Sequence, residues 1–343
     1  MPPVPTPRGE LSDALLSALA EPVRPLGALA PPASTGDALV DEDLQLALYV
    51  MYELHYRGFD GVDERWEWEP SLLALRRELE HAFTRSLFDL AGEPAREDVL
   101  AEEMDVALRA ILEADDGPSL SLHLERNGTL DEILEFVVHR SAYQLKEADP
   151  HAWAIPRLSG QAKAAIVEIE ADEFGGGRAD RIHATLFAQS MEELGLDPAY
   201  GAYLDRIPAL TLATVNLMSM LGLHRRWRGA IVGHLALFEM SSAVPNHRYG
   251  NALRRHGFGE AATAFFDVHV EADAVHESIA AVDLAGGLVR AEPALAGDVL
   301  WGARTLAALE ARWGESLLSA WSAGRTSLLA PLGQAAAPAE AMR

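Results

Sequence analysis

The segment His269-x-x-x-Asp273-x-x-His276 carries two imidazoles and one carboxylate at a helical spacing. At 3.6 residues per turn, positions i, i+4 and i+7 lie on one face of a helix, so these side chains project together. Phe265 and Phe266, one turn earlier, indicate that this face or its edge turns toward the core. Because unpaired polar groups are costly there, the three groups need a partner, and a metal ion is one candidate. A solvated face that happens to carry two of the twelve histidines is the alternative.

Further carboxylates and imidazoles fall on the apolar stripes of other expected helices. Glu239 follows Val232 and Leu235 on one such stripe, with no cation one turn away to pair with it. A lone buried glutamate must be protonated, paired or bound to a metal. Taken singly, residues of this kind are more often surface groups or hydrogen-bonded core groups. Together they form one candidate ligand set, which comprises Glu147, Glu173, His183, Glu239, His269, Asp273 and His276.

The donor types in this set suit iron or manganese, because carboxylate oxygens and imidazole nitrogens are hard to borderline ligands. Its four carboxylates would balance the four positive charges of two ferrous ions, so the charge count fits a dinuclear centre. The chain has no His-Glu-x-x-His, which disfavours a zinc hydrolase. Its Glu-x-x-His at Glu78 and His81 has no second copy, which disfavours a di-iron protein of the ferritin type.

Composition excludes several classes of function. The chain has 28 Lys and Arg, 52 Asp and Glu, a formal net charge of −24 and no cysteine. A surface this negative repels phosphate backbones and anionic lipid headgroups, so neither nucleic acid nor a membrane is an expected partner. Without cysteine there is no disulfide framework, thiolate zinc site, iron–sulfur cluster or thiol nucleophile. The first residues lack the features of a secretory signal, so a cytoplasmic location is expected.

The positions that carry this chemistry must be supplied by helices. Apolar residues recur every three to four positions without alternating β-branched runs, which predicts an all-α protein. Eight of the 19 prolines lie in the first 32 residues, so residues 1–36 are expected to be a flexible arm with room for one short helix around 11–19. Residues 325–343 are expected to be a loose tail. The turn at 115–118 is the expected boundary between an N-terminal helical segment, 37–117, and a main domain, 118–324.

Helix start signals refine this division. Asp41-Glu42-Asp43 and Pro70-Ser71 each open a helix in the N-terminal segment, and Thr129-Leu-Asp-Glu132 is a capping box that opens the main domain. The other helices are expected at about 97–112, 129–148, 160–173, 179–194, 208–223, 229–243, 258–285 and 296–322.

Taken in order along the chain, these motifs resemble the heme-oxygenase-like diiron oxidase and oxygenase superfamily, whose members are often called iron-containing redox enzymes. The resemblance covers about 130–285 and is carried by Tyr143-Gln-Leu-Lys-Glu147, Asp172-Glu173-Phe-Gly-Gly-Gly-Arg178, His183-Ala-Thr-Leu-Phe187, Phe238-Glu239 and the His269 to His276 motif. It implies a heme-oxygenase-like helical bundle with an N-terminal extension that contributes to a homodimer. It also implies that two irons are bound by Glu147, His183, Glu239, His269, Asp273 and His276. N-oxygenases of the family add a glutamate before the first histidine, which Glu173 matches, with Glu170 and Asp172 as alternatives.

The resemblance further implies a non-heme diiron oxygenase that activates O2 through a peroxo-diiron(III) intermediate and draws on an external reductant of unknown identity. The additional glutamate favours N-oxygenation of a small amine or guanidine-like metabolite in a biosynthetic pathway. Oxidative C–C cleavage or desaturation of an amino or fatty acid is the alternative within the family. A non-catalytic acidic helical binding protein and a heme-binding protein are the alternatives outside it. No catalytic residue separate from the metal ligands is expected.

Some residues near these motifs have simpler interpretations. Arg178 and Arg181 either hold a substrate carboxylate or solvate their turn. The glycines at 175–177 are expected to end a helix and let the backbone bend, since no strand precedes them as a phosphate-binding loop requires. Trp66 and Trp68 are expected to be packing or subunit-interface anchors, and His55 a hydrogen-bonded histidine.

Overall fold

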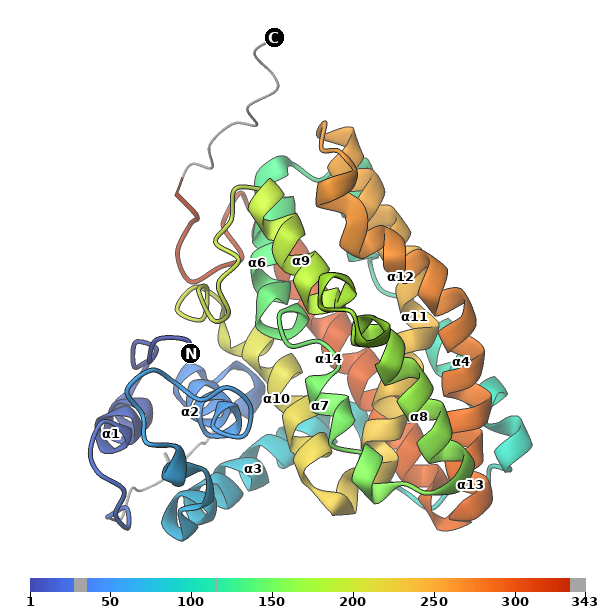
Figure 1. Ribbon diagram of the computed structural model, residues 1–343, viewed down its shortest axis with the longest axis horizontal. Helices are drawn as coiled ribbons and strands as arrows, with labels where there is room; N and C mark the ends of the chain where they lie inside the picture. The colour runs from blue at the N-terminus through green and yellow to red at the C-terminus, as the bar shows by residue number, and fades with distance from the viewer. Residues whose placement is uncertain (28–35, 115, 334–343) are drawn as a thin grey trace.

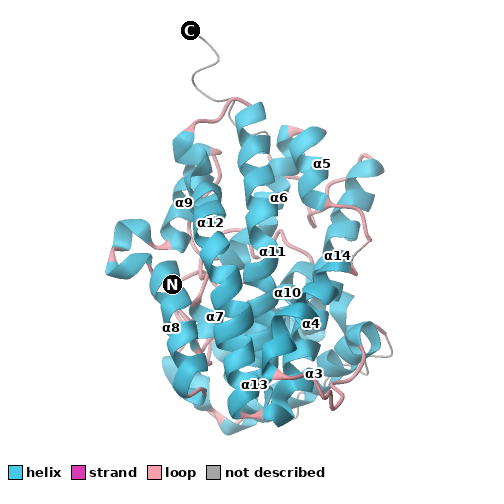
Figure 2. Cartoon of the chain, turned by 90° about the vertical axis from the view of Figure 1, so that its right-hand side faces the viewer, coloured by secondary structure: helices cyan, strands magenta, loops and turns pink. Residues whose placement is uncertain are grey.

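The described part of the chain folds entirely into helices and turns. The computed structural model describes residues 1–27, 36–114 and 116–333, apart from the side chains of Glu271, Asp273 and Ala274. Over these ranges there is no strand (Figure 2), so the all-α prediction is confirmed. None of the helices in them is long and apolar enough to cross a bilayer.

The helices that matter most for the candidate ligands form one bundle around α11 (Arg228–Arg255). This helix packs along α12 (Glu260–Ser278) and α14 (Ala296–Ser322), and α9 (His183–Glu193) packs on α12. Figure 1 shows these helices beside α6 (Leu130–Gln144), α8 (Gly160–Glu173) and the short α7 (Asp149–Ala152). The bundle is completed by α4 (Met104–Glu113), α5 (Leu120–Arg126), α10 (Ala209–Leu223) and α13 (Gly287–Ala291).

Local sequence signals explain several helix ends. The hydroxyl of Thr129 accepts from the backbone N–H of Glu132, while the Glu132 carboxylate accepts from the backbone N–H of Thr129 at 2.7 Å. This reciprocal pair is the predicted capping box, and it starts α6. Helix α3 (Pro70–Ala91) has Pro70 at its first position, where a missing N–H costs nothing.

Tertiary packing overrides local signals at other boundaries. Helix α11 was expected to end at 243 but continues through Pro245 to Arg255, because its second half is held against α5 and α12. The helix expected at 97–112 begins only at Met104. The helix expected over 258–285 is α only to Ser278 and then becomes a π-helix over Ile279–Gly286.

The first residues are not the free arm that their prolines suggested. The short helix is present as α1 (Glu10–Leu19), and its leucines are buried against α2 (Glu42–Glu53). Leucines at one helical face supply an apolar stripe that outweighs the flanking prolines. Before it, Thr6 donates to Asp205 at 2.8 Å and Arg8 pairs with Glu42 at 2.6 Å. Residues 28–35 of the expected arm lie outside the described residues.

The expected loose tail is also docked where the structure describes it. Leu328 is buried, and the backbone N–H of Leu329 donates to the carbonyl of Arg206 at 2.8 Å. The Ser327 hydroxyl and N–H both donate to the Glu135 carboxylate, so partly buried hydrogen bonds hold this segment against the bundle. Residues 334–343 lie outside the described residues.

The N-terminal helices share the core of the main bundle. Helix α2 packs on α10 and α3 packs on α14, so buried apolar side chains run across the expected boundary at 115–118. Trp66 is fully buried and donates to the Glu21 carbonyl at 3.3 Å, which makes it a packing anchor within the chain. Trp68 is 67% exposed. His55 is hydrogen-bonded to Glu67 at 2.9 Å, as predicted. The domain division and the homodimer contact stay predictions.

Two glycines set the close approach of α11 and α14. A Cβ at Gly233 would lie 1.8 Å from the carbonyl oxygen of Val299, and one at Gly302 would lie 2.0 Å from that of Ala230. Both obstacles are backbone atoms, which cannot rotate away, so the two helices meet only where each offers a glycine to the other.

We therefore expect Gly233→Ala to destabilise the fold by about 3 kcal/mol or more, because the helices must separate to admit the methyl group. Gly27→Ala is the matched control, since nothing lies within 4 Å of a Cβ there. Thermal unfolding followed by circular dichroism measures both. Equal melting temperatures for the two variants would contradict this account of the α11–α14 contact.

Candidate metal centre

Carboxylates and imidazoles from five segments of the chain meet inside the bundle. Glu147 follows the end of α6, Glu173 is the last residue of α8, and His183 is the first of α9. Glu239 comes from the middle of α11, while α12 supplies the histidine motif. Two groups have ligand atoms that all lie within 4.8 Å of one another: Glu147, Glu173, His183 and His269 in the first, and Glu173, Glu239 and His276 in the second.

The first group is compact and fully buried. His183 Nδ1 lies 2.7 Å from Glu173 Oε2 and 3.2 Å from His269 Nε2. His269 Nε2 in turn lies 3.6 Å from Glu147 Oε2. Two carboxylate oxygens and two imidazole nitrogens thus converge on one small volume, which is the donor set and spacing of a metal site.

The second group shares Glu173 with the first. His276 Nδ1 lies 3.2 Å from Glu239 Oε2, and its Nε2 lies 3.3 Å from the half-exposed Asp172. The Asp273 side chain, predicted to belong here, lies outside the described residues. The structure therefore brings together the other six predicted ligands. Of the three candidates for the additional carboxylate, Glu173 is the one in both groups.

A backbone hydrogen bond orients His269. Its Nδ1 lies 2.7 Å from the carbonyl oxygen of Phe265, which can only accept, so Nδ1 carries the proton. The lone pair is then on Nε2, the nitrogen that faces Glu147 and His183. Metal-binding histidines are usually oriented in this way, with the far nitrogen donating to a carbonyl or carboxylate.

Several polar atoms of the cluster are buried without a hydrogen bond. They are Glu147 Oε2, Glu173 Oε2 and His276 Nδ1, and Glu170 Oε2, outside the two groups, is buried in the same way. Glu173 Oε2 has an imidazole nitrogen close by, but the angles do not suit a hydrogen bond. Atoms that crowd together without bonding to one another leave buried polar groups unsatisfied, which is costly unless a cation lies between them. The residues present therefore fit a bound metal.

Burial sets the protonation of these groups in the metal-free protein. It raises the pKa of Glu173 to about 8 and that of Glu170 to about 9, and it raises the pKa of Glu147 against the pull of His269. It lowers the pKa of His183 to about 4, so this imidazole is neutral and ready to bind a metal at neutral pH. The pKa of His276 is raised, because Glu239 and Glu173 outweigh the burial that would lower it.

Irregular backbone lets the ligand segments approach. Gly175, Gly176 and Gly177 all have left-handed φ angles, of 68°, 59° and 80°, and end α8 as predicted. A Cβ at Gly175 would lie 2.6 Å from the backbone of Arg181. Among the described non-glycine residues, Ala148 has the positive φ, 73°, directly after Glu147. Such strain persists only where surrounding contacts enforce it, and it is frequent at functional sites.

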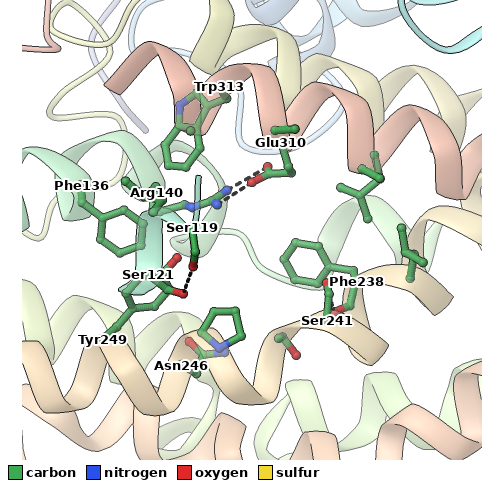
Figure 3. A pocket seen from close by; sticks show the side chains of 18 of the residues that line it. Ser119, Ser121, Phe136, Arg140, Phe238, Ser241, Asn246, Tyr249, Glu310 and Trp313 are labelled. Carbon is green, nitrogen blue, oxygen red and sulfur yellow. Dashed lines mark hydrogen bonds and ion pairs between the residues drawn. The ribbon is translucent and has the colours of Figure 1, made fainter. Parts of the chain in front are cut away.

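A cavity of about 370 Å³ reaches the first group. Glu147 and His269 form part of its wall, and Phe187, Phe238 and Phe266 line it beside them. Figure 3 shows another part of its wall, where Arg140 pairs with Glu310 and lies beside Phe136 and Trp313. A volume of this size accepts a small molecule and places it against two of the candidate ligands.

The arginines singled out from the sequence do not line this cavity. Arg178 is exposed and pairs with Asp180 at 3.1 Å, and Arg181 is exposed as well. Sequence reasoning missed Arg140 instead. One signal was available, because Arg140, Gln144 and Glu147 follow at i, i+4 and i+7 and so share a helical face. Its partner Glu310 lies 170 residues away, and no local pattern predicts that contact.

Comparison with known proteins places this geometry in a family. The family model described as "Iron-containing redox enzyme" matches residues 134–311, just over half of the chain and the stretch that holds every candidate ligand. The chain belongs to the iron-containing redox enzymes. This membership supports an oxidoreductase with the heme-oxygenase-like all-α fold, and the buried acidic and histidine cluster is compatible with the iron that the family's description names.

One curated relative is a nitrosourea synthase from Streptomyces achromogenes subsp. streptozoticus. It is 30% identical over 148 residues, which are 43% of this chain and 31% of the relative. The chain therefore matches less than a third of that protein's length.

In this iron-containing redox enzyme, a buried ion pair braces the first candidate ligand from the N-terminal side. Lys146, directly before Glu147, pairs with Glu53 of α2 at 3.0 Å, and the two side chains are 1% and 0% exposed. The Tyr200 hydroxyl donates to the same Glu53 oxygen at 2.7 Å, and Arg57 donates to the Leu145 carbonyl at 3.0 Å. The N-terminal segment thus fixes the turn that carries Glu147.

We expect the affinity for Mn(II) to rise with pH. Metal binding must displace the proton of Glu173, whose folded-state pKa is about 8, so between pH 6 and 8 each displaced proton adds about tenfold per pH unit. Without metal, the stability of the fold changes with pH in the opposite direction. The pKa of Glu173 is higher in the folded protein than its ordinary value, so the contribution of this glutamate to stability is lost as pH rises from about 5 to 8. Melting temperatures with and without Mn(II) at pH 6, 7 and 8 measure both trends, and a metal-induced shift independent of pH would contradict them.

We also expect Glu53→Gln to weaken Mn(II) binding by about tenfold or more, because Lys146 loses its partner and Glu147 its brace. Glu80→Gln is the matched control, since Glu80 is an equally buried carboxylate of the N-terminal segment that accepts from Tyr52 at 3.0 Å and has no described contact with 145–149. Isothermal titration with Mn(II) on both folded variants measures the difference. Equal losses in both would assign the effect to general destabilisation.

Proposed function

We propose that the chain is a non-heme diiron oxygenase whose irons are held by the two residue groups. The first iron would be bound by Glu147, Glu173, His183 and His269, and the second by Glu173, Glu239 and His276, with Asp273 as the further ligand implied by its helical register. The observation that carries the proposal is the position of Glu173, whose carboxylate belongs to both groups. A carboxylate shared in this way suits a bridge between two metal ions.

The charge balance supports two divalent ions. Four carboxylates, including Asp273, would offset four positive charges, so the centre could remain buried in an apolar bundle without a net charge. When bound, two ferrous ions supply electrons for the reduction of O2. The chain's own residues supply geometry: Phe265 fixes the tautomer of His269, and the strained turn at Ala148 fixes Glu147.

The reaction we propose is N-oxygenation of a small amine or guanidine-like molecule. For an amine it is R–NH2 + O2 + 2 electrons + 2 protons → R–NHOH + H2O, in which an external reductant is oxidised and the second oxygen atom leaves as water. Two points support it: Glu173, which the resemblance matches to the additional glutamate of N-oxygenases, belongs to both ligand groups, and the relative's name describes a product with a nitrogen–oxygen bond. The aromatic wall of Phe187, Phe238 and Phe266 would keep bulk water from the reacting nitrogen.

The metal assignment is tested by anaerobic titration with Fe(II), with bound iron measured per chain. We expect two irons in the wild type and loss of both in Glu173→Ala, because that variant removes a ligand from each ion. Glu170→Gln is the matched control: Glu170 is also buried on α8 but belongs to neither group, so it should retain two irons. A wild type that binds one iron or none, or a Glu173→Ala variant that keeps both, would contradict the proposal.

The reaction is tested with the iron-loaded protein, a chemical reductant and ¹⁸O2 over a panel of amines and guanidines. One ¹⁸O atom on nitrogen in a product is the expected result, detected by mass spectrometry. Products that carry oxygen on carbon, or a new double bond, would instead favour C–C cleavage or desaturation.

A further inference from the structure

Apart from the two candidate metal ligands, the wall of the cavity carries one cation and one anion. Arg140 Nη1 donates to Glu310 Oε1 at 3.0 Å, and Nη2 donates to Oε2 at 2.6 Å. The guanidinium also stacks over the Trp313 ring at 4.1 Å. Both side chains keep some exposure, 18% and 25%, and both line the cavity (Figure 3). These charges therefore face the space that a substrate would occupy.

The pair selects among ligands by charge. Because its members neutralise each other, a ligand with a single charge would gain one contact while separating the pair and leaving one buried charge uncompensated. A ligand that carries both charges avoids this penalty, since its carboxylate can meet Arg140 while its ammonium group meets Glu310. Among the described residues, the other ionisable side chains that line the cavity are Glu147 and His269, which belong to the candidate metal site, and the phenol of Tyr249.

A second polar group points to a hydrogen-bond donor on the ligand. Gln144 lines the same cavity, one turn beyond Arg140 on α6, and its Oε1 is buried without a hydrogen-bond partner. An unsatisfied buried acceptor costs free energy that a ligand N–H can recover. An ammonium group placed between Gln144 and Glu310 would satisfy both acceptors.

The distance from Arg140 to Glu147 limits the length of the ligand. Arg140 lies on α6 four residues before its end at Gln144, and Glu147 lies three residues beyond that end, in the turn that follows. The wall between these two residues is apolar, with Phe238 and Phe266 among its residues. A head group at Arg140 would therefore leave one long side chain to span the distance to the cluster.

We propose that the cavity binds a free amino acid as its zwitterion. The carboxylate pairs with Arg140, the α-ammonium group with Glu310 and Gln144, and the side chain extends past the phenylalanines so that its far end meets the cluster at Glu147 and His269. This assignment rests on the proposed function for the orientation of the substrate, but the binding itself requires no turnover.

Binding to the full chain in the presence of Mn(II) tests the proposal by isothermal titration, with two probe sets. L-Norleucine is compared with pentylamine, which lacks the carboxylate, and with hexanoate, which lacks the α-ammonium group. L-Phenylalanine is compared with phenethylamine and 3-phenylpropanoate in the same way. We expect the zwitterion of at least one set to bind tenfold or more tighter than both of its single-charge analogues. Failure of both zwitterions to bind, or analogues that bind equally well, would overturn the proposal.

Glu310→Gln provides a signature that a purely structural ion pair would not give. Arg140 then has no anionic partner, so the carboxylate-only analogues should bind tighter than in the wild type while the preference for the zwitterion falls at least threefold. Glu292→Gln is the matched control, because it breaks a comparable pair with Arg228 that lies outside the cavity, and it should leave all affinities unchanged. An unchanged preference in Glu310→Gln would also overturn the proposal. These probes do not report iron binding, so failure of the metal assignment is seen separately in the iron titration.

Discussion

The interior of this protein must hold several carboxylates in one place, and much of the rest of the structure follows from that constraint. Glu147, Glu173 and Glu239 are each at least 93% buried, and oxygens of the first two have no hydrogen-bond donor. Burial of an ionised carboxylate without a counter-charge is prohibitive, so in the metal-free protein burial raises the pKa of Glu147 and of Glu173 above the ordinary value, and these two groups retain their protons to higher pH. A divalent cation removes that penalty. The fold is therefore less stable without the metal than with it.

Buried carboxylates that repel one another stay close together only if a rigid frame of backbone holds them. The frame is built from backbone features that side chains cannot easily alter: glycine contacts between α11 and α14, the left-handed turn after Glu173 and the strained Ala148. Lys146 and Glu53 extend the frame into the N-terminal helices. This buried pair gives the N-terminal segment a role inside its own chain, whatever its part in assembly.

The sequence was informative where chemistry repeats with the period of a helix. The motif from His269 to His276 and the apolar stripe that ends at Glu239 could be interpreted from i, i+4 and i+7 spacing alone, and most main helices followed from the same rule. The resemblance to a known family then ordered the dispersed ligands. What spacing could not supply was which chain segments meet. The contact of Arg140 with Glu310 and that of Lys146 with Glu53 join residues 170 and 93 positions apart, and each exists only because helices distant in sequence pack together.

The termini show the opposite error, in which composition was given too much weight. Prolines near the N-terminus do prevent long helices, but they do not prevent docking, because Leu11, Leu15 and Leu19 still present one apolar face. A short amphipathic helix needs a partner surface to be stable, and the sequence gives no direct indication of where that surface lies.

Helix α6 and the turn after it connect the two ends of the cavity. Arg140 and Gln144 lie on α6 itself and Glu147 lies on the turn that follows it, so the proposed head-group site and a candidate metal ligand belong to one continuous segment. Their separation depends on that turn as well as on the helix, and the Lys146–Glu53 pair and the strained Ala148 hold the turn in place. In the proposed site, a molecule too short to reach from the charged pair to Glu147 would lose contacts at one end, and one too long could not place its head group at the pair. The charged pair would then select the class of ligand, and the distance from the pair to Glu147 would select its length.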